Sequence, residues 1–254
     1  MAEESKGLDI FGVKPIAQAV ETVTAGTVAG ASAFLSRICL PAAEEFGLLI
    51  QDKVRGWRAK NAALIASKAE VKLGAQPETQ DVHAHPRLVG LILEQGSWIE
   101  VDEIQEMWAG LLASSCTEDG LDDSNLMFAD LLSRLSASQA RILDHACRHA
   151  GKVVAPNGLI FVPFDGEVHI DLETLHSVSG VTDLHRLDRE LDHLRGLELI
   201  NPDGGGFNLN SPVPTADATP TTLALQMFAR LSGYRGDPVP FFGLTQPENQ
   251  ADGS

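Results

Sequence analysis

The stretch VDEIQEMWAGLLASS, at residues 101–115, decides the fold class, because several independent features make it a helix. Glu103 and Glu106 lie in its first turn, where the helix dipole favours acidic side chains. Apolar residues then recur at the three- and four-residue spacing of one helix face; they are Ile104, Met107, Trp108, Leu111 and Leu112. The stretch predicts an amphipathic helix in a mainly α-helical protein.

Helical patterns continue on both sides of this stretch. A further helix is predicted between residue 87 and residue 101, and a third at 125–135, after an acidic turn at 117–124. One long helix is predicted over 42–73, beginning just after Pro41. Its apolar residues recur at helical spacing; they are Phe46, Leu49, Ile50, Val54, Trp57, Leu64, Ile65 and Val71. The Gly- and Pro-containing segment 74–87 predicts a linker.

The long helix is locally basic. Its candidate partner or membrane face consists of Lys53, Arg55, Trp57, Arg58, Lys60, Lys68 and Lys72. A basic helical face binds anionic lipid or an acidic partner, or is simply solvated. The preceding residues 22–36 carry no charge. That segment is shorter than the roughly 20 residues that span a bilayer, so a tightly packed helix is favoured and shallow membrane insertion is the alternative.

Residues 136–235 predict a winged-helix-like α+β region. Ser136 and Gln139 have the spacing of a helix-capping box, Asp171 and Thr182 are predicted caps of two further helices, and Gly180 ends the first of these. The segment ELINPDGGGFNLN, at residues 198–210, then predicts strand, Gly-rich turn and strand. Helix, helix, helix, hairpin is the order of a winged helix, and residues 219–234 predict a closing helix.

The fold class is therefore mainly α, with N-terminal long helices and a helical bundle followed by the winged-helix-like region. The predicted organisation is an N-terminal helical region at 1–80, a bundle segment at 81–135, the winged-helix-like domain at 136–235 and a flexible tail at 236–254.

The charge distribution disfavours nucleic-acid binding. The net charge is −16, and residues 81–254 hold 26 Asp and Glu against ten Lys and Arg. The third helix of the winged-helix-like region mixes arginines with acids, and the wing segment NPDGGGFN has no Lys or Arg. Because each phosphate contact needs a cation, a winged helix of this charge favours protein contacts over DNA.

The residues do not predict an active site or a cofactor. The three cysteines are odd in number and none lies in a CxxC pair, which suits a reducing cytoplasm. His145 and His149 share a helix face as zinc ligands do, but no HExxH pattern accompanies them, and His83 and His85 lack further ligands at metal spacing. The expected protein is thus cytoplasmic, non-enzymatic and free of metal and cofactor.

Two stretches carry a family resemblance, EIQEMWAGLLASS at 103–115 and NLMFADLLSRLSASQARIL at 125–143. They resemble the abortive-infection alpha family, which has a helix ending in L-L-A-S-S, an acidic turn, and a helix running into L-S-x-x-x-A-x-I-L. The matching positions include Met107, Ala109, Leu111, Leu112, Ala113 and Ser114, then Leu135, Ser136, Ala140, Ile142 and Leu143. The resemblance covers residues 10–235, with one departure: many members have His-Pro where this chain has Ser124 and Asn125.

The resemblance implies anti-phage defence by abortive infection, in which an infected cell stops growing before the phage spreads. It brings no catalytic residues. We therefore expect a non-enzymatic defence protein that acts through protein partners, a homo-oligomer or peripheral membrane contact. The alternatives are a winged-helix transcriptional regulator, a membrane-active effector that uses the N-terminal segment, and an enzyme whose site is assembled only in the folded chain.

Overall fold

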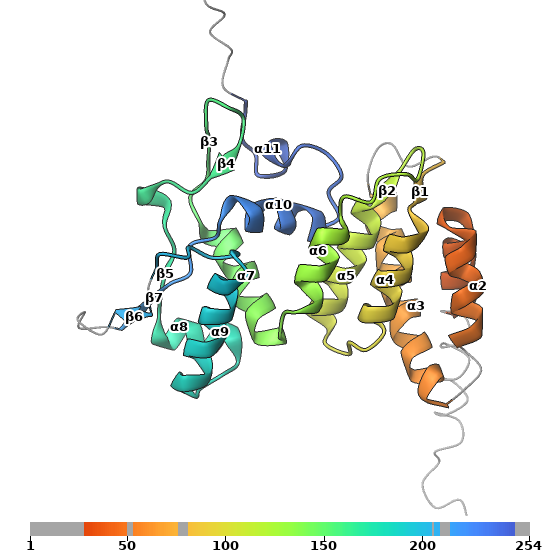
Figure 1. Cartoon of the computed structure of the whole chain (residues 1–254), viewed down its shortest axis with the longest axis horizontal. Coiled ribbons are helices and arrows are strands. Elements are labelled where there is room, and N and C mark those ends of the chain that lie inside the picture. Colours follow the sequence, from red (N-terminus) through yellow and green to blue (C-terminus); the bar gives the residue numbers. More distant parts are fainter. Residues whose placement is uncertain (1–27, 50–52, 76–80, 205, 209–213, 247–254) are drawn as a thin grey trace, which may run out of the picture.

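The computed structural model describes residues 28–49, 53–75, 81–204, 206–208 and 214–246, and most of them are helical (Figure 1). This confirms the mainly α fold class. Residues 28–38 are helical and precede α2 (Leu40–Leu49). The N-terminal helices that follow are α3 (Lys53–Gly74), α4 (Pro86–Gly96), α5 (Asp102–Ser114) and α6 (Leu126–Ser133). A short ribbon of β1 (His83–Ala84) and β2 (Cys116–Thr117) lies at one end of these helices (Figure 1).

In place of the one long helix predicted at 42–73, the structure has two helices, α2 and α3. Residues 50–52 between them lie outside the described part. The predicted apolar stripe is also wrong at two positions, because Val71 is 72% exposed and Trp57 is 36% exposed. The buried side of α3, which packs chiefly against α5, is instead built mainly from small residues. They are Ala59, Ala62, Ala63, Ala66 and Ala69, with Ile65 and Leu73. Small side chains allow the two helices to approach closely.

The second half of the described chain contains four α-helices of eight residues or more. They are α7 (Ala137–His149), α8 (Leu172–Ser179), α9 (Leu184–Gly196) and α10 (Thr222–Leu231). The predicted capping box is confirmed. The backbone N–H of Gln139 donates to Ser136 Oγ, and the backbone N–H of Ser136 donates to the side-chain oxygen of Gln139. Asp171 caps α8, and Gly180 ends it with a left-handed φ of 71°. The cap of α9 is Asp183 rather than Thr182, because the Asp183 carboxylate accepts from the Arg186 amide.

The strands of this half form two small antiparallel sheets. The first is a hairpin of β3 (Val153–Val154) and β4 (Ile160–Phe161), followed by the 3-10 turn η1 (Phe164–Gly166). The second has the order β5-β7-β6, from β5 (His169–Asp171), β6 (Phe207–Asn208) and β7 (Thr215–Asp217). The strand pairing predicted within 198–210 is therefore wrong. Residues 201–204 form a turn, and the partner of β6 is β7, later in the chain.

Helix α10 joins the two halves, because it packs against both α5 and α7 and lies across them in Figure 1. The contact with α5 depends on Gly110, where a Cβ atom would overlap the carbonyl group of Leu231. The short helix α11 (Pro238–Phe241) then packs on α10. One continuous hydrophobic core runs through all these helices and crosses the predicted boundaries at residues 80 and 135.

Candidate functional site

The basic face of α3 meets acidic residues of α5. Lys68 Nζ lies 2.5 Å from a carboxylate oxygen of Asp102 and 3.0 Å from one of Glu106, and Lys72 Nζ lies 2.8 Å from the other Glu106 oxygen. Burial of Glu106 would raise its pKa, but the hydrogen bonds from Lys72 and Lys68 outweigh burial and lower it. Burial would likewise lower the pKa of Lys68, and its bonds to Asp102 and Glu106 raise it instead.

The start of the same face contacts the α4–α5 connection. Trp57 Nε1 donates to Glu100, and its ring meets Trp98 edge-on at 6.1 Å between centroids. Arg58 lies 4.2 Å from the centre of the Trp98 ring and donates to Ser97 Oγ at 3.0 Å. Lys60 is exposed, whereas the side chains of Lys53 and Arg55 lie outside the described part. Trp57, Arg58, Lys68 and Lys72 of the predicted face thus contact acidic side chains or aromatic rings of this same protein.

Membrane contact by this face stays a prediction. Among the described side chains of the face, that prediction now rests on Lys60. Over the ranges described, no helix is both long enough and apolar enough to cross a membrane. Of the uncharged segment 22–36, residues 22–27 lie outside those ranges, whereas residues 28–36 are helical and bury Ala31, Phe34 and Leu35.

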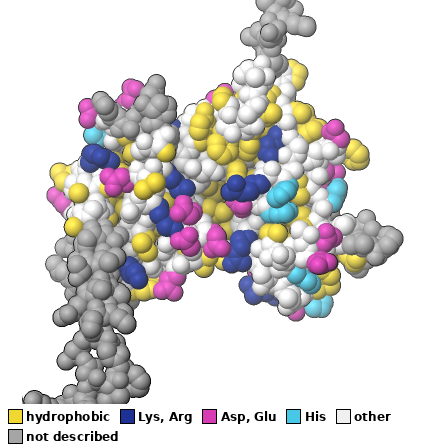
Figure 2. All heavy atoms as spheres, turned by 180° about the vertical axis from the view of Figure 1, so that it is seen from behind, with side chains coloured by type: hydrophobic (Ala, Val, Ile, Leu, Met, Phe, Trp, Pro, Cys, Tyr) yellow, Lys and Arg dark blue, Asp and Glu magenta, His cyan; other side chains and the backbone are white. Residues whose placement is uncertain are grey.

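A cleft of about 790 Å³ lies between the two halves of the molecule. Charged and histidine side chains from α3, α5 and α7 form part of its wall, and apolar side chains of α10 and α11 form another part. The charged and histidine residues are Lys72, Glu103, Glu106, Arg141, Asp144, His145, Arg148 and His149. Figure 2 shows charged and histidine side chains gathered near the middle of the face that it displays.

Most of the charges in this cleft are paired within the protein. Arg148 binds both carboxylate oxygens of Asp144, at 2.7 and 2.9 Å, and lies 5.3 Å from the centre of the Phe228 ring. Arg141 donates to the carbonyl of Ser179 at 2.7 Å, which ties α7 to the end of α8. Sequence reasoning missed this cleft, because its walls come from helices far apart in the chain that share no motif.

The i, i+4 histidines of α7 stack at this cleft, with ring centroids 4.0 Å apart. His149 Nδ1 lies 2.8 Å from the carbonyl oxygen of His145, a contact that orients the second ring. Burial, followed by the proximity of His149, lowers the pKa of His145. Within the described ranges there is no group of three His, Cys, Asp or Glu side chains arranged to hold a metal ion.

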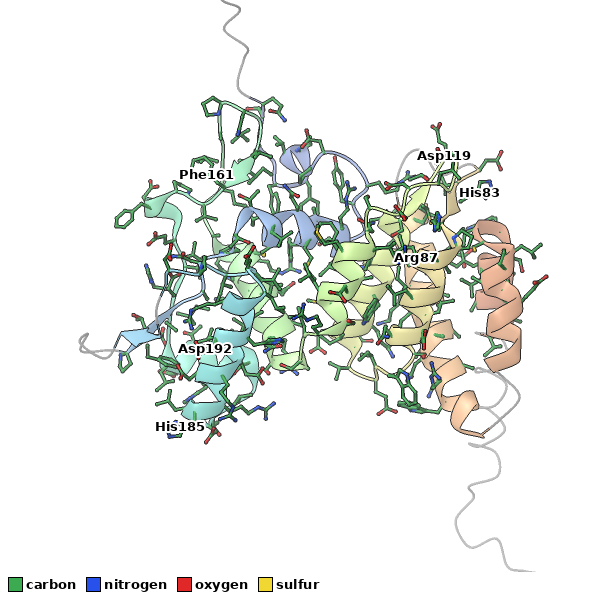
Figure 3. The ribbon with its side chains drawn as sticks, viewed as in Figure 1. His83, Arg87, Asp119, Phe161, His185 and Asp192 are labelled. Carbon is green, nitrogen blue, oxygen red and sulfur yellow. The ribbon has the colours of Figure 1, made fainter. Side chains whose placement is uncertain are left out.

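Helix α9 presents charges of both signs. Its exposed residues include His185, Arg186, Arg189 and Asp192 (Figure 3). Arg186 pairs with Glu190 at 3.3 Å, and Arg195 pairs with Asp192 at 2.7 Å. Beyond α9, residues 197–229 include no Lys or Arg. A positive surface of the kind that binds a phosphate backbone is therefore not formed by this helix or by the described residues of 197–229.

Asn125, at the departure from the family pattern, lies in a buried polar contact. Its side-chain amide donates to Ser114 Oγ at 3.2 Å and to Ser115 Oγ at 3.0 Å. The two serines end the L-L-A-S-S stretch of α5, so the residue before α6 binds directly to the end of α5.

Comparison with known proteins gives one family. No curated protein and no solved structure matches the chain. The family model described as abortive infection alpha matches residues 58–220, which run from α3 to the residue before Thr221, the cap of α10. Because this match covers more than half of the sequence, the chain belongs to the abortive infection alpha family.

Proposed function

We propose that this protein is a non-enzymatic anti-phage defence protein that acts by abortive infection through contacts with another protein. Membership of the abortive infection alpha family is the observation that carries the defence role. The contact surface that we assign to this role is the exposed face of α9.

The arrangement of residues 137–217 supports a winged helix as the module that presents this face. Apart from the β3–β4 hairpin and η1, which lie between α7 and β5, the chain order is α7, β5, α8, α9, β6, β7, and the antiparallel sheet has the order β5-β7-β6. In a winged helix the third helix is the one that projects for recognition, and the last two strands form the wing. Here α9 is the third helix, and β6 and β7 are the wing strands.

The charges of α9 favour a protein partner over duplex DNA. Two of its three arginines, Arg186 and Arg195, pair with acids on the same helix, and residues 197–229 contribute no Lys or Arg. A DNA-binding winged helix neutralises several phosphates with Lys and Arg. A surface with both signs instead complements a protein surface with both signs, which gives specificity rather than general attraction. A winged-helix transcriptional regulator is therefore the less favoured function.

A plaque assay tests the defence role and the contact surface together. Cells that express the protein, alone and with its neighbouring genes, are infected and compared with cells that carry an empty vector. We expect fewer plaques with the intact protein and a loss of this protection with Arg189→Glu on α9. The matched control is Arg134→Glu, an equally drastic change of an exposed arginine outside α9. Equal plaque counts with and without the intact protein would remove the defence role.

A DNA-binding measurement separates the two winged-helix functions. We expect no binding of random or operator-like duplexes below micromolar concentration at physiological salt, measured by fluorescence anisotropy. Binding that is tighter than this and weakens steeply with added salt would favour the regulator instead.

A further inference from the structure

The cleft between the two halves of the molecule has the size of a small-molecule binding site. Its volume is about 790 Å³, within the range of roughly 300–1,000 Å³ that such sites have. Side chains of α3 and α5 line it from the first half, and side chains of α7, α8 and α10 line it from the second. Among the described residues, none of α9 lines it, so the cleft is separate from the surface that we assign to the defence role.

One part of the lining is apolar and includes two aromatic rings. Phe228 of α10 and Phe241 of α11 meet edge to face, with their ring centroids 6.0 Å apart. Phe241 is half-buried, so part of its ring stays accessible. The other apolar residues of the lining are Met107, Val178 and Leu231. Aromatic and aliphatic side chains of this kind bind the flat, apolar part of a ligand.

The charged part of the lining contains one cation without an acidic partner. Its lysine and one of its arginines each bind a carboxylate of the protein. Arg141 instead donates from Nη1 to the neutral carbonyl of Ser179, and no Asp or Glu of the described residues lies within ion-pair distance of it. Its Nε atom is buried without a hydrogen-bond acceptor. Glu103, the acid of the lining that these ion pairs leave over, lies on α5 and is exposed to solvent, which screens its charge.

Two imidazole rings continue the row that Arg141 begins on α7. His145 and His149 follow it at four-residue steps, and residues at this spacing share one helix face. All three line the cleft. The bond from His149 Nδ1 to the carbonyl of His145 fixes the second ring before any ligand binds. Guanidinium, and imidazole once both of its nitrogens carry a proton, donate hydrogen bonds to carboxylate and phosphate oxygens.

The row on α7 adjoins the apolar part of the lining, because the Arg148 guanidinium lies 5.3 Å from the centre of the Phe228 ring. We propose that the cleft binds a small aromatic anion, with its carboxylate or phosphate group on Arg141 and its ring against Phe228 and Phe241. A neutral aromatic ligand would leave Arg141 without a counter-charge. An inorganic anion would leave the apolar part of the lining uncovered.

The first experiment titrates the intact wild-type chain with four probes at neutral pH and follows the histidine ring protons by NMR. Phenyl phosphate and benzoate have both parts of the proposed ligand, whereas benzyl alcohol lacks the anion and inorganic phosphate lacks the ring. We expect at least one aromatic anion to bind with a Kd below about 1 mM, and both other probes to bind at least about tenfold more weakly. The protons of His145 and His149 should shift, and those of His185, exposed on α9, should not. The tighter of the two aromatic anions identifies the preferred anionic group.

The second experiment repeats the titration with variants whose folding is checked by circular dichroism. Arg141→Gln removes the charge but keeps a side-chain donor, and it should weaken binding of the tighter aromatic anion at least about tenfold. The matched control Arg134→Gln changes an exposed arginine outside the cleft and should bind as the wild type does.

Four results would overturn the proposal. They are no shift of His145 and His149 with either aromatic anion, an equal shift of His185, binding of benzyl alcohol or inorganic phosphate as tight as that of the aromatic anions, and unchanged binding to folded Arg141→Gln. The wild-type titration decides the question even if Arg141→Gln does not fold. Because these titrations do not involve phage, a failure of the ligand site is distinguishable from a failure of the defence role.

Discussion

The α3–α5 pair and the α7–α9 pair are held together by different interactions. Between α3 and α5, alanines pack closely in the core and ion pairs lie only at the edge, around Lys68 and Glu106. Between α7 and α9, buried leucines of α9 are accompanied by a cluster of hydrogen bonds at the start of α7. Glu190 of α9 accepts hydrogen bonds from Ser136 Oγ at 2.9 Å and from Ser138 Oγ at 2.8 Å, at the start of α7. Gln139 Nε2 adds a contact of 2.8 Å to His193 Nδ1.

This difference predicts which changes each region tolerates. A close-packed helix pair is sensitive to added volume, because backbone atoms have nowhere to move. A polar contact is sensitive to the loss of one partner, because the remaining groups then lack hydrogen bonds in a half-buried place. The following changes test this distinction, from the largest expected effect to the smallest.

Gly110→Ala should cause the largest loss of stability. The added methyl group would overlap the backbone carbonyl of Leu231, so α10 would have to move away from α5. We expect the free energy of unfolding to fall by about 3 kcal/mol or more, measured by urea denaturation. Gly90→Ala is the control, because the space around Gly90 on α4 is open. That change should raise stability by about 0.5–1 kcal/mol, as alanine favours a helix. A tolerated Gly110→Ala would show that α10 does not pack this closely.

Glu190→Ala should have the next largest effect. It removes the acceptor of both Ser136 and Ser138, and we expect a loss of about 1–3 kcal/mol in the free energy of unfolding. Glu118→Ala removes an acid from an exposed turn and serves as the control, with an expected change within about 0.5 kcal/mol. If both variants were equally stable, the polar contact would not hold α9 to α7.

The two kinds of packing also differ in how far the sequence predicts them. Local signals were sufficient for the start of α7 and the end of α8, because the capping box of Ser136 and the left-handed Gly180 act within a few residues. They missed the start of α9 by one residue, where Asp183 is the cap. The buried face of α3 was not predictable in this way. Its large apolar residues Trp57 and Val71 are partly or largely exposed, while alanines, which are common on any helix face, form the contact.

Contacts between residues far apart in the chain account for the other differences between the sequence-based predictions and the structure. The strand pairing predicted within 198–210 is wrong because β7, the partner of β6, lies further along the chain. The cleft needed the three-dimensional arrangement of α3, α5, α7 and α10 before it could be recognised.

Glu106→Gln should have a smaller effect that depends on pH. The lowered pKa of Glu106 means that its ion pairs stabilise the folded state above the unfolded pKa, and this contribution is lost as the pH falls through the folded value. Because the side chains are partly exposed, we expect wild type to exceed the variant by about 1 kcal/mol or less at pH 7. The difference should vanish in acid. A difference that persists well below pH 4 would point to packing rather than charge.

The smallest expected effect concerns His145. Burial, followed by the nearby His149, lowers its pKa, so the folded state favours the neutral ring. Stability should therefore decline slightly as the pH falls through the ordinary histidine value of about 6.5, and His145→Gln should remove part of this decline. NMR titration of the ring protons checks the cause directly. A pKa at or above the ordinary value would contradict the stacked arrangement in the cleft.

The position of α10 has a consequence for how the protein is made in the cell. The face of α5 around Gly110 is covered by residue 231, and Arg235 donates to the carbonyl of Cys116 across 119 residues of sequence. A ribosome releases the chain from its N-terminal end, so the first helices emerge long before their covering helix exists. The apolar surface of the first helices therefore stays uncovered until α10 has been translated. A chain that is terminated before α10 lacks the helix that closes its first half.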